Sequence, residues 1–161
     1  MNKLSYLLSA LVLVFVLVIS GCDGDDDPGV PAADQVGLTF SGTWNASSVT
    51  FGSPSQDRSG DYDDFSLTIT YVDGTNGGTV SISGGPDGFR PFATSDTWAY
   101  AGEITDPATT AFSVTRASDG LSIAVSNLTA NSMSLSFLLA EDGSTSRQEA
   151  VAGTWNFDFT R

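Results

Sequence analysis

Four aspartates gather in one short segment and are the clearest candidates for acid–base or metal chemistry. Asp57, Asp61, Asp63 and Asp64 lie in the sequence SQDRSGDYDDF, with Arg58 among them. Paired carboxylates serve glycosidases as acid and base, and carboxylate oxygens are the ligands that Ca²⁺ prefers. The same composition is typical of a solvated loop in which Arg58 offsets part of the charge. We favour the solvated loop, with a calcium loop as the alternative, and expect no metal or cofactor.

Residue types on which many enzymes depend are missing or rare. The 161 residues include no histidine and one cysteine, Cys22. This excludes a Ser-His-Asp triad, a Cys-His dyad, a Cys/His zinc cluster and a disulfide within the chain. Six basic residues stand against nineteen acidic ones, so the basic surface that nucleic-acid binding needs is excluded as well. The composition favours a non-catalytic protein.

The first 21 residues predict a secretory signal peptide. Lys3 supplies the positive start, residues 10–19 (ALVLVFVLVI) are an uninterrupted apolar run, and Ser20-Gly21 supplies small residues for cleavage. The whole apolar segment, residues 4–19, is shorter than the roughly 20 residues that a membrane-spanning helix needs. Cleavage after Gly21 would remove the only lysine and leave five arginines against nineteen carboxylates.

The junction Val18-Ile19-Ser20-Gly21-Cys22 resembles the lipobox of bacterial lipoproteins, in which an aliphatic residue and two small ones precede a cysteine. The resemblance implies that the Cys22 sulfur carries diacylglycerol, that the chain is cut before Cys22, and that the new amino group is acylated, for example with palmitate. Two or more acyl chains anchor a protein stably. We therefore expect membrane lipid to be a partner through Cys22.

Residues 22–36 are expected to form an acidic, disordered tether behind the anchor. The run DGDDDP and the following GVPAADQVG are acidic, contain prolines and lack an apolar period. An acidic run behind the cysteine resembles the surface-export signal of some Gram-negative lipoproteins, whereas Asp23 at the next position resembles an inner-membrane retention signal. We expect the bacterial cell envelope, with the outer membrane favoured and surface exposure as an option.

The remaining segment, residues 37–161, predicts an all-β domain. Apolar and hydroxyl residues alternate along Phe65–Tyr71, Leu121–Ser126 and Ser132–Leu139, and turn sequences such as Asp73-Gly74 and Asp119-Gly120 separate such runs. The expected strands cover 44–51, 63–72, 79–83, 97–101, 110–115, 121–126, 132–140 and 152–160. A change of phase between Ala46 and Val49 predicts a β-bulge in the first of them.

About eight strands joined by short turns predict an antiparallel up-and-down meander. Eight strands with one apolar face can close into a barrel, and a two-sheet β-sandwich is the alternative. The first and last strands would otherwise be exposed edges, so we expect them to pair and close the sheet. The outward-facing serines and threonines suit water rather than lipid.

Gly42-Thr43-Trp44 at the start of the first strand resembles the Gly-x-Trp signature of lipocalins, which are eight-stranded barrels around a ligand cavity. In that family an arginine after the last strand packs over the tryptophan, and Arg161 is at the matching position. Small bacterial lipocalin-like lipoproteins, which the chain resembles in particular, carry a second Gly-x-Trp before the last strand, as in Gly153-Thr154-Trp155. The sequence departs from the lipocalin pattern in two ways. It has no Thr-Asp-Tyr-like motif, and it leaves no room for the C-terminal helix of lipocalins.

The inward-facing aromatic residues of such a barrel allow two interpretations. They could line a pocket for a small apolar ligand, or simply fill the core. The strands are short, so we expect a mostly filled barrel with at most a shallow pocket near Trp98 and Tyr100. The candidate pocket or core aromatics are Trp44, Tyr71, Trp98, Tyr100 and Trp155.

Three functions stay open at the level of sequence. The favoured one is a membrane-anchored envelope lipoprotein with a non-catalytic binding or accessory role, whose partner would be another envelope protein; Phe89, Pro91 and Phe92 are its candidate exposed apolar patch. The alternative is a carrier of a small apolar ligand. A carbohydrate-active or calcium-dependent enzyme that uses the loop carboxylates is the least favoured.

Overall fold

The computed structural model describes residues 29–86, 92, 94–140 and 152–161. Each of the eight expected strands is present, with bounds within three residues of the expected ones, and a two-residue strand is added. The elements are α2 (Ala32–Phe40), β1 (Gly42–Phe51), β2 (Gln56–Asp57), the 3₁₀ helix η1 (Ser59–Asp61), β3 (Ser66–Tyr71), β4 (Gly77–Ser83), β5 (Ser95–Tyr100), β6 (Phe112–Arg116), β7 (Ser122–Ser126), β8 (Ser132–Leu139) and β9 (Gly153–Thr160).

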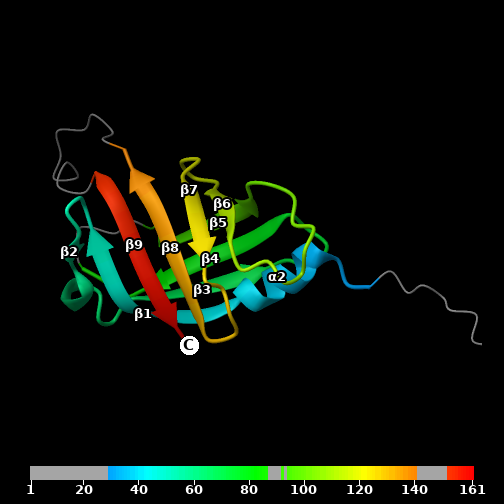
Figure 1. The fold of residues 1–161 in the computed structure, drawn as a ribbon, viewed down its shortest axis with the longest axis horizontal. Coiled ribbons are helices and arrows are strands. Elements are labelled where there is room, and N and C mark those ends of the chain that lie inside the picture. Colours follow the sequence, from blue (N-terminus) through cyan, green and yellow to red (C-terminus); the bar gives the residue numbers. More distant parts are fainter. Residues whose placement is uncertain (1–28, 87–91, 93, 141–151) are drawn as a thin grey trace, which may run out of the picture.

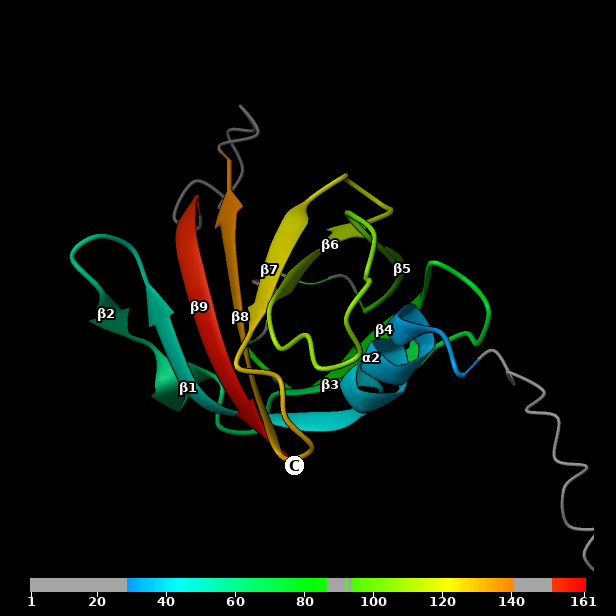
Figure 2. The same ribbon diagram turned by 45° about the vertical axis from the view of Figure 1, so that its right-hand side comes forward.

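The strands form one closed antiparallel sheet. Their order is β2-β1-β3-β4-β5-β6-β7-β8-β9, and β1 also pairs with β9. This pairing closes β1 and β3–β9 into an eight-stranded up-and-down barrel, which curls round in Figures 1 and 2. The expected barrel is confirmed, and the two-sheet sandwich is wrong because a single sheet returns to its own first strand.

The closing strand β1 changes its partner along its length. Residues 42–45 pair with β3, and Thr50 and Phe51 pair with β2 on the same edge. On the other edge β1 pairs with β9, and the register shifts between Ala46 and Ser48. The predicted bulge is therefore confirmed, with Ser47 as the extra residue; its hydroxyl donates to the Asp158 carbonyl at 3.0 Å.

The two ends of the barrel are built from different connections. At one end, here called the helix end, lie α2, the β3–β4 turn, the β5–β6 connection, the β7–β8 turn and Arg161. The opposite end carries the β1–β3, β4–β5, β6–β7 and β8–β9 connections. Figure 2 shows α2 at the helix end, where it packs beside β3.

Inward-facing residues fill the barrel with aromatic and aliphatic side chains. Burial alternates along β3, β7, β8 and β9 as the sequence pattern predicts. Phe157 is the centre of an aromatic stack, with ring centroids 5.8 Å from Phe159, 5.9 Å from Trp155 and 6.0 Å from Phe137. Such contacts give a barrel its packed interior.

The outer wall of the barrel consists mainly of hydroxyl side chains. Ser134 Oγ donates to Asp158 Oδ1 at 2.6 Å, and the hydroxyls of Thr43 and Thr68 lie 3.1 Å apart across β1 and β3. Among the outward-facing positions of the barrel strands, Asp158 is the charged one. The wall therefore presents a nearly neutral polar surface to water.

The end of the expected tether is helical, which corrects the boundary predicted at residue 36. Ala32–Phe40 form α2, and Val36 and Phe40 are buried against the barrel. The reason is a spacing of four residues, which places both side chains on one face of a helix. The expected signal peptide and residues 22–28, which include Cys22, lie outside the described residues. The folded unit thus includes α2 as well as the barrel.

Deletion of residues 152–161 tests whether closure holds the barrel together. We expect the shortened domain to lose cooperative unfolding, because β1 and β8 lose their shared partner and the core loses Trp155, Phe157 and Phe159. Circular dichroism during thermal unfolding measures this. The control chain ends at Thr160 and lacks only Arg161; it should unfold cooperatively. A truncated chain that melts cooperatively near the parent temperature would show that closure is dispensable.

Candidate functional site

The central cavity of the barrel is small. The described residues leave a volume of about 30 Å³, lined by apolar side chains including Phe40, Trp98 and Phe92, with Arg116 at its wall. Pockets for organic ligands usually measure about 300–1,000 Å³. This cavity is close to the size of one water molecule. The described part of the barrel is therefore filled, as the short strands predicted.

The five aromatic candidates are all buried. Trp44, Tyr71, Trp98, Tyr100 and Trp155 have exposed fractions of 7% or less. Trp98 lines the central cavity, and its indole N–H donates to the Thr79 carbonyl at 3.2 Å. Tyr100 instead packs edge-on against Trp98, with ring centroids 5.3 Å apart. These residues form core and end contacts rather than the wall of a ligand pocket.

Trp44 closes the helix end together with Arg161, as the lipocalin resemblance implied. The Arg161 guanidinium carbon lies 3.9 Å from the centroid of the Trp44 ring. Arg161 also donates to the carbonyls of Ala130, at 3.1 Å, and Thr39, at 2.9 Å, and to that of Ser41. One arginine thus joins the end of β9 to α2, β1 and the β7–β8 turn.

The glycines two residues before Trp44 and Trp155 make room for the side chains that stack on these tryptophans. A Cβ at Gly42 would lie 2.8 Å from a nitrogen of Arg161. At the opposite end, a Cβ at Gly153 would lie 2.8 Å from the Phe51 ring, which packs on Trp155 at 4.6 Å. Residues i and i+2 of a strand share a face, so any side chain at the glycine would displace the stack.

A buried carboxylate fixes α2 to the barrel. Asp34 is 6% exposed and accepts hydrogen bonds from the Tyr71 hydroxyl at 2.5 Å and from the Gly74 N–H at 3.1 Å. The Tyr71 hydroxyl also lies 2.7 Å from the Thr75 carbonyl, so it shares one hydrogen between two acceptors. The Tyr100 hydroxyl reaches the same helix by donating to the Ala33 carbonyl at 3.1 Å.

These contacts shift the pKa values of the groups at the helix end. The Tyr71 hydroxyl and then the Gly74 N–H hold the pKa of Asp34 below its ordinary value, against the opposing effect of burial. Burial raises the pKa of Tyr71, and the Asp34 carboxylate adds to it. Burial also raises the pKa of Tyr100 to about 12. Asp34 is therefore ionised and both tyrosines are neutral at ordinary pH.

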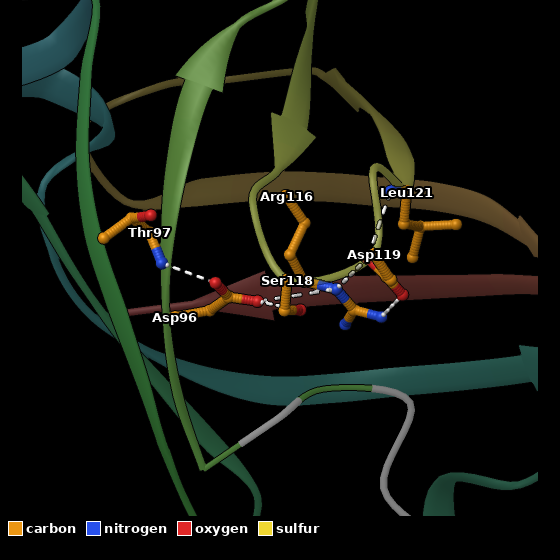
Figure 3. Close-up of polar contacts among 6 residues, drawn as sticks. All are labelled: Asp96, Thr97, Arg116, Ser118, Asp119 and Leu121. Atoms are coloured by element: carbon orange, nitrogen blue, oxygen red, sulfur yellow. Dashed lines mark hydrogen bonds and ion pairs between the residues drawn. The ribbon is translucent and has the colours of Figure 1, made fainter.

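Arg116 occupies the opposite end in an ion-pair cluster (Figure 3). Its Nε lies 2.9 Å from Asp119 Oδ1 and its Nη2 lies 2.6 Å from Asp119 Oδ2, a bidentate pair that lowers the pKa of Asp119. The Asp96 carboxylate is 3.8 Å away and accepts from the Ser118 hydroxyl at 2.5 Å. This arrangement ties the β6–β7 turn to β5.

The loop aspartates act within their own loop. Asp57 Oδ1 accepts from the N–H of Ser59 at 2.9 Å and from its hydroxyl at 2.7 Å, which lowers the pKa of Asp57 and fixes the start of η1. Asp61 Oδ2 lies 2.6 Å from the Nε of Arg58, the counter-ion expected from the sequence. Both aspartates are exposed.

The remaining two loop aspartates do not complete a metal site. Asp63 and Asp64 are both exposed. Asp64 Oδ1 accepts from the Gly85 N–H at 2.8 Å and holds the β4–β5 connection. Among the described residues, no three His, Cys, Asp or Glu side chains are grouped so that they could hold a metal ion. In the described part of the chain the loop carboxylates are thus used separately, for turn and loop contacts, as the solvated-loop interpretation expects.

Phe92, expected on an exposed apolar patch, is instead part of the core. It is 4% exposed, its ring stacks on Phe65 at 5.9 Å and it meets Phe137 edge-on at 5.2 Å. A loop phenylalanine that closes a barrel end gains more by burial than by exposure. Phe89 and Pro91 lie outside the described residues.

Two of the interior polar residues were missed at the level of sequence. The acidic, proline-containing sequence predicts Asp34 in the tether, although Val36 and Phe40, spaced four apart, indicate a helix around it. The alternation of Phe112 and Val114 extends inward to Arg116, and this is the signal that could have found it.

Comparison with known proteins gives no relative from which a function could be transferred. No protein-family model, no curated protein and no solved structure matches the chain. The function must therefore be argued from the residues and their geometry.

The contacts of Asp34 predict an acid-sensitive attachment of α2. A carboxyl whose pKa is lowered on folding adds stability above its unfolded pKa of about 4, and this is lost as the pH falls through the folded pKa. We expect Asp34→Asn to lower the melting temperature at neutral pH, and the difference from the parent to vanish in acid. Melting curves of both chains between neutral and strongly acidic pH measure it. A difference that stays constant with pH would contradict the prediction.

Proposed function

We propose that the protein is a lipid-anchored lipoprotein of the bacterial envelope, whose lipocalin-like barrel has a non-catalytic, accessory role. In this role its outer surface and loops contact a partner, and the interior serves only stability. The observation that carries the proposal is the filled interior: a central cavity of about 30 Å³ is far below the volume of a site for an organic ligand.

The lipid anchor in this proposal rests on the sequence around Cys22. The lipobox-like residues 18–22 include the only cysteine of the chain, at the position where the lipid is attached in lipoproteins. Among the residues that the structure describes, no helix is long and apolar enough to span a bilayer. In this proposal the acyl chains on Cys22 insert into membrane lipid, and the outer membrane is the favoured location.

The barrel architecture supports the comparison with lipocalins. A closed meander of eight antiparallel strands, a Gly-x-Trp at the start of β1 and an arginine stacked on that tryptophan occur together. The departure from a ligand carrier is the interior, where Phe40 and Phe92 reach the central cavity from the two ends. An accessory role therefore fits the geometry better than transport of a small apolar ligand.

Substitution of Cys22 tests the anchor. In a bacterial host we expect the parent chain to partition into detergent, with an intact mass that corresponds to residues 22–161 plus acyl groups. Cys22→Ser should leave the chain unprocessed, since the sulfur that accepts diacylglycerol is missing. A chain with an ordinary secretory signal before residue 23 is the control and should be recovered as a soluble protein. A free thiol on Cys22 in the parent would refute the anchor.

A titration with a fluorescent fatty-acid probe tests the filled interior. We expect no saturable one-to-one binding at submicromolar probe, since a cavity of about 30 Å³ buries too little apolar surface. Phe40→Ala, which enlarges the central cavity, is the control and should gain affinity for a small aromatic ligand such as benzene, as engineered apolar cavities do. Tight binding by the parent would instead support the ligand carrier.

A further inference from the structure

Exposed apolar side chains are few, and most of them lie at the helix end. Among the described residues four large apolar side chains are exposed: Val30 at 55%, Leu38 at 59%, Val72 at 47% and Leu138 at 64%. Val30 lies two residues before α2, Leu38 is in α2, and Val72 follows β3 directly. Leu138 is at the far end of β8 and belongs to the opposite end of the barrel.

The outward face of α2 carries no charge. Its one charged residue, Asp34, is turned toward the barrel, where Tyr71 and Gly74 hold the carboxylate. The exposed residues of α2 are Gln35, Leu38 and Thr39. In a chain with nineteen acidic residues, an uncharged helix face with an exposed leucine is a surface that can approach lipid without desolvating a carboxylate.

The length of chain between the anchor and the fold places this surface near the membrane. Gly29, where the described residues begin, is seven residues after Cys22. A fully extended chain spans at most about 3.3–3.6 Å per residue, so Gly29 lies within about 25 Å of a lipidated Cys22. Because α2 starts three residues later, the helix end is the part of the domain tied closest to the bilayer.

We propose that the helix end docks on the lipid bilayer, with Val30, Leu38 and Val72 entering its interfacial layer. The proposal rests on the lipid anchor proposed above and adds the orientation of the domain. Once Cys22 is inserted, docking is intramolecular, so a few aliphatic side chains are sufficient at the high local concentration of the surface. Asp73 beside Val72, and Glu103 and Asp106 in the β5–β6 connection, are exposed at the same end. These carboxylates disfavour anionic lipid, so zwitterionic phosphatidylcholine is the matched surface.

Docking in this orientation decides which surface is left for a partner. The opposite end, with the Arg116 cluster and the β1–β3 loop, points away from the lipid to which Cys22 belongs. The proposed accessory contacts then fall on that end and on the hydroxyl wall, whereas α2 is covered.

Site-directed fluorescence on the lipidated full-length protein tests the docking. Leu38→Cys and Leu138→Cys each introduce one free thiol, because the native cysteine is blocked by its lipid. Both positions are exposed leucines with similar exposed fractions, so Leu138→Cys is a matched control. Each purified variant carries the fluorophore NBD and is reconstituted into phosphatidylcholine vesicles with or without brominated acyl chains, and flotation with the vesicles is measured in parallel.

We expect brominated lipid to reduce the emission at position 38 roughly twofold, as for a group within about 5–10 Å of the acyl chains, and to leave position 138 unchanged. Equal quenching at both positions, or none at position 38 in protein that floats with the vesicles, would overturn the docking and leave the anchor intact. Protein that does not float would overturn the anchor and the docking with it.

Discussion

The pairing of β1 with β9 is the interaction on which the remaining structure depends. It joins the first and last strands of a meander whose other contacts are between sequence neighbours, and it leaves no barrel strand without two partners. The bulge at Ser47 belongs to this pairing, because the extra residue increases the local twist that a closing strand needs. Without closure, the aromatic stack around Phe157 would have a sheet on only one side.

The same tetrapeptide, Gly-Thr-Trp-Asn, is used once in each of the two closing strands. Because β1 and β9 are antiparallel neighbours, Trp44 and Trp155 come to lie at opposite ends of the barrel. Trp44 is covered by Arg161, which directly follows β9, and Trp155 is covered by Phe51, its partner on β1. The motif therefore has a local physical meaning: a tryptophan that closes one barrel end, and a glycine that leaves space for its cover.

Alternation and turn chemistry were sufficient to predict the strands and their order, because a period of two residues is a local property. Closure was predicted separately, because the first and last strands would otherwise be exposed edges. What lay beyond prediction depends on tertiary contacts. The helix α2 is short, and Phe40 becomes part of the core through its packing on Trp98 and Phe112, which lie far along the chain. The local sequence predicts that Asp34 is a solvated acid. Its partner, the Tyr71 hydroxyl, lies thirty-seven residues away in the chain and is not predicted by any local pattern. Phe92 reads as an exposed loop residue for the same reason.

The hydroxyl wall has a consequence for crowding. Among the described residues, charge is concentrated at the two ends of the barrel, whereas its side carries mainly serine and threonine. Electrostatic repulsion between proteins is screened within about 8 Å at physiological ionic strength, so the approach of two parallel barrels is governed by the facing walls rather than by the net charge. The proposed anchor and docking would therefore let copies stand side by side on one membrane at high surface density, separated by hydration layers instead of by mutual repulsion.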